Sequence, residues 1–210
     1  MSSELKEGAQ QTLSHKELLA ILEKQGFKIH ESEKEDFPAT IQRDGFEKLS
    51  PTGNKVLEDL VSRSKNYING VIIEDTFGDT FEQRQARDNA WSSLEKRHGN
   101  AITNIQLRDK LKIGSSVGTI KAYFEWFVKE LDTSGVSTER SKSVRQLYKE
   151  LVETIPHTIS EQSGQMVVDT YGAMNFEEKK EVAKNIDDIL RRFLLLVTAD
   201  NTEPKVDAVE

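Results

Sequence analysis

The sequence predicts a mainly α-helical protein with a helix-turn-helix module inside a helical domain, and three observations lead to this fold class. Apolar residues recur every three or four positions along most of the chain. Capping pairs, in which Ser or Asn is followed three residues later by Glu, precede two of these stretches. Near the middle, a short turn containing glycine separates two such stretches.

Five segments are expected along the 210 residues. A polar, disordered tail over 1–13 precedes an N-terminal helical or winged-helix-like segment over 14–70, in which a short β wing is one alternative. A module over 71–135 holds the helix-turn-helix. A helical region over 136–199 serves dimerisation or packing, and 200–210 form an acidic tail.

The N-terminal segment begins with a helix. Ser14 is its expected N-cap, with Glu17 completing a capping box, and Gly26 is suited to end it. The polar stretch that follows contains Pro and Gly, and short strands are expected there at 28–30 and 40–42.

Ser50 and Pro51 carry the signature of a second helix start, with a capping hydroxyl and a proline in the first turn. The apolar run 71–73 is read as a strand or an extended connector. Another helix is then expected from Asp79 or Thr80 to Arg97, where His, Gly and Asn follow as a break.

Three helical segments are expected after the central module, over about 138–154, 160–174 and 176–199. Asn175 and Glu178 form a capping box for the last one. Its apolar stripe is wide enough to serve as a core face or as a contact with a partner.

In the helix-turn-helix, Thr103 or Asn104 caps a first helix that runs to about Leu111. Gly114 lies in the turn, and Ser115 or Ser116 caps the second helix. The expected buried face of the second helix consists of Val117, Ile120, Phe124, Phe127 and Leu131. A recognition helix needs small polar residues near its start, since that end approaches base edges and phosphates. The candidate DNA-binding residues are Thr103, Arg108, Lys112, Ser115, Ser116, Gly118, Thr119 and Lys121.

Among the aromatic residues of the second helix, Trp126 lies one position off the buried stripe. It is therefore the aromatic side chain best placed for a partly exposed contact, whereas Phe124 and Phe127 are expected in the core.

The segment 89–131 resembles the N-terminal DNA-binding domain of the KfrA-type plasmid regulators. The resemblance is carried by Ala90, Leu94, Gly99, Thr103, Arg108, Leu111, Gly114, Ser115, Thr119 and Trp126. In that family a long alanine-rich coiled coil follows the domain, whereas here about eighty residues precede the segment and only helical segments of ordinary length follow. The resemblance implies sequence-specific binding of double-stranded DNA and a role in transcription or in the regulation of a plasmid or mobile element.

The charge distribution is compatible with such a module. The whole chain carries a net charge of -7, but Glu82 to Glu130 contain nine Lys and Arg against six Asp and Glu. A homodimer or higher homo-oligomer would let two recognition helices address two half-sites.

Other classes remain as alternatives. A generic helical hairpin has the same pattern, so the rival is a helical interaction or assembly protein of a phage, virus or mobile element. A coat-like or single-strand nucleic-acid binder is a variant of that rival. A basic face around 115–121 would favour DNA, and an acidic or apolar face would favour protein.

Enzyme chemistry is not expected. The chain has no cysteine, and none of its four histidines lies three to five residues from another, so neither a cofactor nor a metal site is expected. The first residues lack the apolar segment of a secretory signal, and the longest apolar run, 193–197, is too short to span a membrane. A cytoplasmic location without membrane partners is the expectation.

Overall fold

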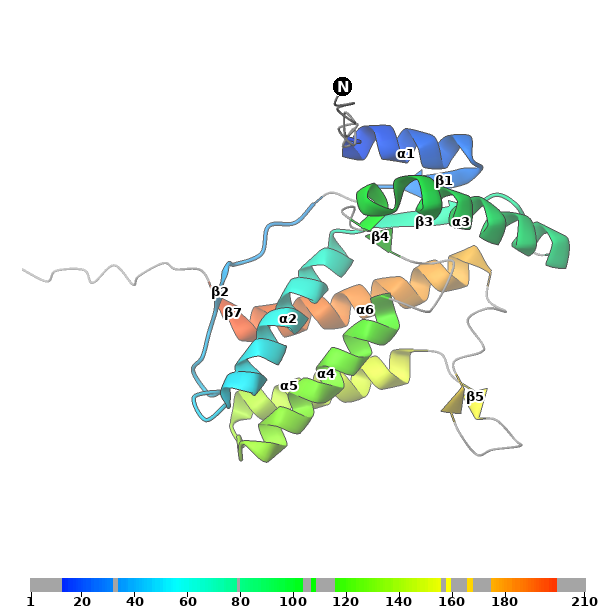
Figure 1. Ribbon diagram of the computed structural model, residues 1–210. Coiled ribbons are helices and arrows are strands. Elements are labelled where there is room, and N and C mark those ends of the chain that lie inside the picture. The colour runs from blue at the N-terminus through cyan, green and yellow to red at the C-terminus, as the bar shows by residue number, and fades with distance from the viewer. Residues whose placement is uncertain are drawn as a thin grey trace, which may run out of the picture.

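The computed structural model describes residues 13–31, 34–78, 80–103, 107–108, 116–155, 158–159, 166–167 and 175–199. Most of them form two regions, which we call the bundle and the lobe (Figure 1). The bundle consists of α2 (Pro51–Ile68), α4 (Ser116–Thr133), α5 (Glu139–Thr154) and α6 (Phe176–Val197). The lobe consists of α1 (His15–Lys24), β1 (Phe27–His30), β3 (Val71–Asp75), α3 (Phe81–Thr103) and β4 (Leu107–Arg108). The expected mainly helical fold class is confirmed.

The core of the bundle is built on a group of phenylalanine rings. Phe193 of α6 has its ring 4.9 Å from that of Phe124 and 6.5 Å from that of Phe127, both on α4. Phe46, from the segment before α2, has its ring 5.9 Å from that of Phe127. All four side chains are almost completely buried. Because buried aromatic rings remove large apolar areas from water, this group holds α4 against α6.

The bundle helices begin at the residues that the sequence indicated. The Ser50 side chain accepts a hydrogen bond from the Gly53 amide at 3.0 Å, with Pro51 in the first turn. Asn175 and Glu178 form the reciprocal capping box at the start of α6. These caps satisfy amide groups that have no partner inside the helix, so the starts of α2 and α6 are fixed locally.

The lobe packs α1 and α3 against a three-stranded sheet of order β1-β3-β4. β1 runs antiparallel to β3, with Phe27 opposite Asp75, and β4 runs parallel to β3, with Leu107 opposite Val71. Its core is separate from that of the bundle, and its buried members are Leu18, Leu19, Leu22, Phe27, Val71, Ile73 and Leu94.

The start of α1 follows the expected capping box. Glu17 accepts a hydrogen bond from the Ser14 amide at 2.7 Å, and the Glu17 amide donates to the Ser14 hydroxyl at 3.3 Å. The Ser14 amide, and after it the Ser14 hydroxyl, hold the pKa of Glu17 below its ordinary value, because their hydrogen bonds to the Glu17 side chain favour the charged carboxylate. The expected strands at 28–30 and 40–42 are present as β1 and as β2 (Thr40–Ile41).

Two expectations about helices have different outcomes. The break expected after Arg97 is present as a kink, because His98 has a non-helical backbone (φ -132°, ψ 24°), and a further helical stretch continues α3 beyond it to Thr103. The helix expected over 160–174 is wrong at Met166–Val167, which form β6 and pair with β5 (Thr158–Ile159). The other residues of 160–174 lie outside the described residues.

The two regions do not follow the expected domain boundaries. α2, from the expected segment 14–70, shares one core with α4, α5 and α6, whereas β1 of the same segment belongs to the lobe. β1 and β2 also lie in different sheets, because β2 pairs with β7 (Thr198–Ala199) at the end of α6. β1 and β2 therefore do not pair with each other to form a β wing.

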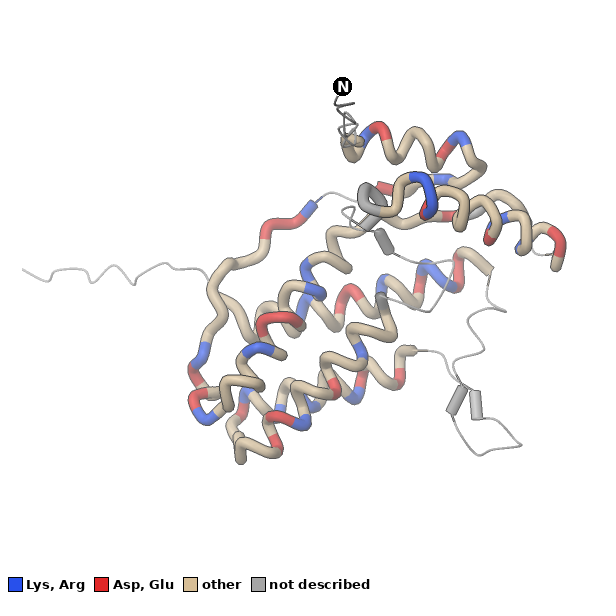
Figure 2. The backbone as a smooth tube through the Cα atoms, viewed as in Figure 1, with Lys and Arg blue, Asp and Glu red and all other residues tan. Residues whose placement is uncertain are grey.

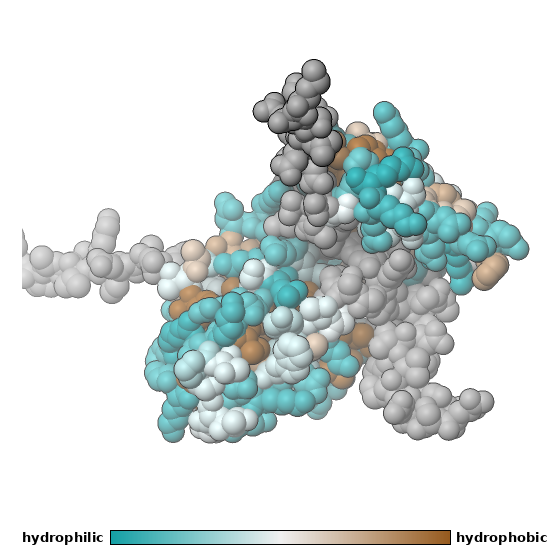
Figure 3. Space-filling view, in the orientation of Figure 1, coloured by the Kyte–Doolittle hydropathy of each residue, from teal (hydrophilic) through white to brown (hydrophobic). Residues whose placement is uncertain are grey.

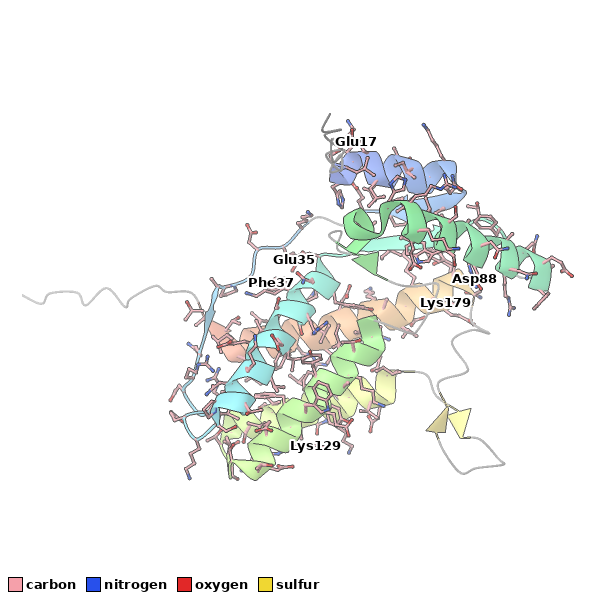
Figure 4. All side chains as sticks on the ribbon, viewed as in Figure 1. Glu17, Glu35, Phe37, Asp88, Lys129 and Lys179 are labelled. Atoms are coloured by element: carbon pink, nitrogen blue, oxygen red, sulfur yellow. The ribbon has the colours of Figure 1, made fainter. Side chains whose placement is uncertain are left out.

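An extended segment before α2 runs along the bundle and is tied to it by polar contacts (Figure 4). Glu35 and Asn69 exchange two hydrogen bonds of 2.8 and 2.9 Å, and Glu35 also forms an ion pair with Arg191 of α6. The Lys65 ammonium donates to the Pro38 carbonyl at 2.8 Å. The segment therefore joins the lobe to the bundle along a defined path.

Candidate functional site

The residues expected to read DNA are not gathered into a helix-turn-helix by the described part of the chain. Thr103 is the last residue of α3 and not a helix cap, and Arg108 lies in β4. Ser116 is the first residue of α4, while Lys112 and Ser115 lie outside the described residues. Gly118, Thr119 and Lys121 follow in the first two turns of α4.

The first helix of the expected module is wrong at Leu107 and Arg108. Both residues are extended and pair in parallel with Val71 and Ile72 of β3. A short apolar pattern such as that around 105–111 fits either a helix or a strand. The free edge of β3 decides between them, because it offers backbone partners that the sequence alone does not reveal.

The second helix is confirmed as α4, together with most of its expected buried face. Ile120, Phe124, Phe127 and Leu131 are all buried, and Val117 is partly buried against the same core. The periodicity of α4 was therefore a reliable guide to packing, although its role as a recognition helix stays a prediction.

Gly118, Thr119 and Lys121 do not share one face of α4. Gly118 is exposed, and a side chain added there would meet no atom within 4 Å. Thr119 and Lys121, which are both half-buried, lie two residues apart and so point about 200° apart around the helix. DNA that lies against one side of α4 would therefore contact only one of these two side chains.

The outer face of α4 is not basic. Lys129 is balanced by Glu125 one turn earlier, at 3.3 Å, and Lys129 projects from the edge of the bundle in Figure 4. The Glu125 carboxylate also raises the pKa of Tyr148 on α5, although burial of the phenol contributes more to that rise. At this position α4 therefore presents a balanced pair of charges, and a basic face around 115–121 stays a prediction.

The same balance holds throughout the described residues. They contain as many Lys and Arg as Asp and Glu, so the net charge of -7 comes from the remaining segments. Figure 2 shows the two signs interspersed along all the helices. Phosphate binding is dominated by clustered cations, and no helix of the described part concentrates them.

A different group of side chains stands out beside α4. The indole of Trp126 is 49% exposed, which confirms the expectation for this residue. Its ring lies 4.9 Å from that of Tyr123, and the Arg63 guanidinium from α2 lies 4.3 Å above the Tyr123 ring. Arg63 also donates a hydrogen bond to the Tyr123 hydroxyl at 3.3 Å. We call Arg63, Tyr123 and Trp126 the Trp126 surface.

The bundle holds the Trp126 surface in place. Tyr123 and Trp126 flank the stripe formed by Phe124 and Phe127, so core packing of the stripe sets their direction. The Arg63 contact, a cation–π interaction reinforced by a hydrogen bond, then limits the motion of the phenol beside the indole. The preorganised set is an apolar ring edged by a cation.

Sequence reasoning missed Arg63 and Tyr123 as members of this group. Tyr123 is three residues before Trp126, so the helical spacing could have suggested their contact. Arg63 is sixty residues from Tyr123, and only the packing of α2 on α4 brings the two together.

Figure 3 shows that the surface of the bundle is not uniformly hydrophilic. On the viewed face, pale residues of intermediate hydropathy and some brown apolar residues interrupt the hydrophilic side chains.

Among the described residues, no group of three or more His, Asp or Glu side chains could hold a metal ion, and no helix is long and apolar enough to cross a membrane.

Comparison of this chain with protein-family models, curated proteins and solved structures gives no match. The resemblance of 89–131 to the KfrA-type regulators therefore stays a prediction from the quoted residues.

Proposed function

We propose that this protein is a helical protein-interaction module that binds a partner protein through the Trp126 surface. The observation that carries the proposal is the half-exposed Trp126 indole, whose ring contacts that of Tyr123, which in turn is held by Arg63. Trp, Tyr and Arg are the residue types that contribute most binding energy at protein interfaces. Holding them in one conformation before binding lowers the entropy cost of association.

The charge of the surroundings favours a protein over a nucleic acid. Glu125 and Glu130 lie on the same helix as Trp126, and Glu130 accepts a hydrogen bond from the Ser50 hydroxyl at 3.0 Å. Phosphate binding requires clustered cations, which this mixture of charges does not supply, whereas a mixed polar rim is ordinary at protein interfaces.

The proposal can be tested by placing a photo-crosslinking amino acid, p-benzoylphenylalanine, at position 126 in the cells that produce the protein. We expect discrete covalent adducts with protein, identified by mass spectrometry, and fewer of them when Arg63→Ala is added. The matched control carries the crosslinker at Ser143, an exposed residue of α5. Adducts with nucleic acid, or adducts no more abundant than at Ser143, would overturn the proposal.

Sequence-specific binding of double-stranded DNA is a second candidate, and the open space around Gly118 favours it. That space allows close approach of another backbone to the first turns of α4. A gel shift comparing a duplex with a single strand at low salt tests this candidate. Salt-sensitive duplex binding that weakens in Thr119→Ala and Lys121→Ala would support it, and no affinity for either nucleic acid would refute it.

A further inference from the structure

The N-terminal end of α3 projects from the lobe without packing against it. Residues 81–86 are all exposed, and the Phe81 ring is 76% exposed. Figure 1 shows this end of α3 extending outward on the side away from α2. The helix start is nevertheless well formed, because Thr80 and Gln83 exchange hydrogen bonds of 3.0 and 3.2 Å. A capped helix end therefore presents an aromatic ring to solvent.

This projecting end complements the Trp126 surface in two ways. Phe81 offers an aromatic ring that can pack against the Trp126 indole, and Glu82 beside it offers a carboxylate. Among the described residues neither Arg63 nor Glu82 makes an ion pair, so both charges are free to form one. An arginine stacked on a phenol keeps N–H groups that can bind a carboxylate in the plane of the guanidinium.

One molecule cannot make this contact with itself in the observed arrangement. Phe81 belongs to the lobe and Trp126 to the bundle, and the α3 end points away from the bundle helices (Figure 1). The complementary pair is therefore available only between two molecules.

We propose that the partner of the Trp126 surface is a second copy of this chain, which docks the Phe81–Glu82 end of its α3 there. This inference rests on the proposed function, because it names the partner of the same surface. The contact joins two different surfaces, so a bound pair of molecules still has one free α3 end and one free Trp126 surface. Such a head-to-tail contact produces rings or open chains, not a closed two-fold dimer.

The test is sedimentation velocity of the full-length protein over a range of concentrations, with two charge-reversal variants. The wild-type protein should form a concentration-dependent series of oligomers. Arg63→Glu places two carboxylates in the contact and Glu82→Arg places two guanidinium groups there, so each variant alone should remain monomeric. An equimolar mixture of the two should assemble again, because every contact between unlike molecules has opposite charges.

Two further variants measure the aromatic part of the contact. Phe81→Ser and Trp126→Ser should each weaken assembly roughly 30-fold, the loss typical of an interface hot spot. A mixture of these two variants should stop at a heterodimer, because only one intact end and one intact surface are present. Leu195→Ser is the matched control, since Leu195 is 75% exposed on α6 but lies outside the contact, and it should assemble like the wild type.

The outcomes separate the two proposals. A wild-type protein that stays monomeric, a charge-reversal mixture that fails to assemble, or a Leu195→Ser variant that cannot assemble would overturn self-docking. Crosslinks from position 126 to a different protein would still support the proposed interaction function. Absence of protein crosslinks at position 126 would overturn both.

Discussion

The bundle and the lobe bury their apolar residues in different ways. Each bundle helix carries a long periodic stripe, and the stripes meet around Phe193. The lobe has fewer buried residues, and three short strands bring distant parts of the chain together. The lobe also interrupts the bundle in sequence, since β3 and α3 lie between α2 and α4. The difference shows that two cores can form from alternating segments of one chain.

The contacts between the two regions are of another kind. The ring of His30 on β1 stacks on that of Phe176 at the start of α6, with centroids 5.2 Å apart, and a 2.7 Å hydrogen bond to Glu74 of β3 holds the His30 ring from within the lobe. Neither ring belongs to one of the two apolar cores. Because hydrophobic burial supplies most cooperative stabilisation, we expect the bundle and the lobe to unfold as separate units.

The largest effect is expected from truncating a core residue in one region. Phe193→Ala should destabilise the bundle by about 3–5 kcal/mol, because it leaves a cavity among buried rings. Each region contains one tryptophan, so Trp91→Phe leaves a bundle probe and Trp126→Phe leaves a lobe probe. In urea unfolding followed by tryptophan fluorescence, the loss of stability caused by Phe193→Ala should appear mainly in the protein that retains Trp126, the bundle probe.

The matched variant is Leu94→Ala in the lobe, where Leu94 is 1% exposed. It should destabilise the lobe by about 2–5 kcal/mol and be seen mainly with Trp91. If both probes shifted equally in both variants, the two regions would form one cooperative unit and the comparison would fail.

A smaller effect is expected from Arg140 of α5, which binds both the segment before α2 and the C-terminal end of α6. Its guanidinium donates hydrogen bonds to the carbonyls of Leu196, Gln42 and Asp44 and lies 4.9 Å above the Phe46 ring. Burial lowers the pKa of Arg140, and nearby Asp44 and Glu47 oppose that change. Arg140→Ala should cost about 1–3 kcal/mol, since it leaves carbonyls without donors.

The control for Arg140 is Arg43→Ala. Arg43 bonds to Glu58 at 3.0 Å, but both side chains are well exposed, so the cost should stay below about 1 kcal/mol. Equal losses in thermal unfolding would show that the carbonyl contacts of Arg140 contribute nothing beyond a surface ion pair.

The smallest effect concerns pH and the contact between α5 and α6. A hydrogen bond from Arg192 holds the pKa of Glu150 below its ordinary value of 4.5. Since the folded-state pKa is depressed, this contribution to stability is present above about pH 4.5 and is lost as the pH falls through the folded pKa. Glu150→Gln should reduce the difference in the free energy of unfolding between pH 7 and pH 3, obtained from urea titrations, by less than about 1 kcal/mol because the pair is exposed. An unchanged difference would contradict this role.

The sequence predicted the helices better than it predicted the candidate site. α2, α4 and α6 follow periodic stripes with local caps, and these are interactions between residues a few positions apart. Trp126 was correctly expected to be partly exposed because helical geometry places it off the stripe. Arg63 was not found, because its contact with Tyr123 depends on two helices that are distant in sequence.

The sequence by itself determined the mainly helical class, the capped starts of the helices and the buried face of α4, since each depends on hydrogen bonds and spacing within one segment. Only the tertiary structure decided that Leu107 and Arg108 form a strand, because the free edge of β3 supplies their backbone partners. It also decided the division into bundle and lobe, which requires contacts between segments far apart in the chain. Interactions within one segment decide which residues form helices, and contacts between distant segments decide which surfaces remain exposed for a partner.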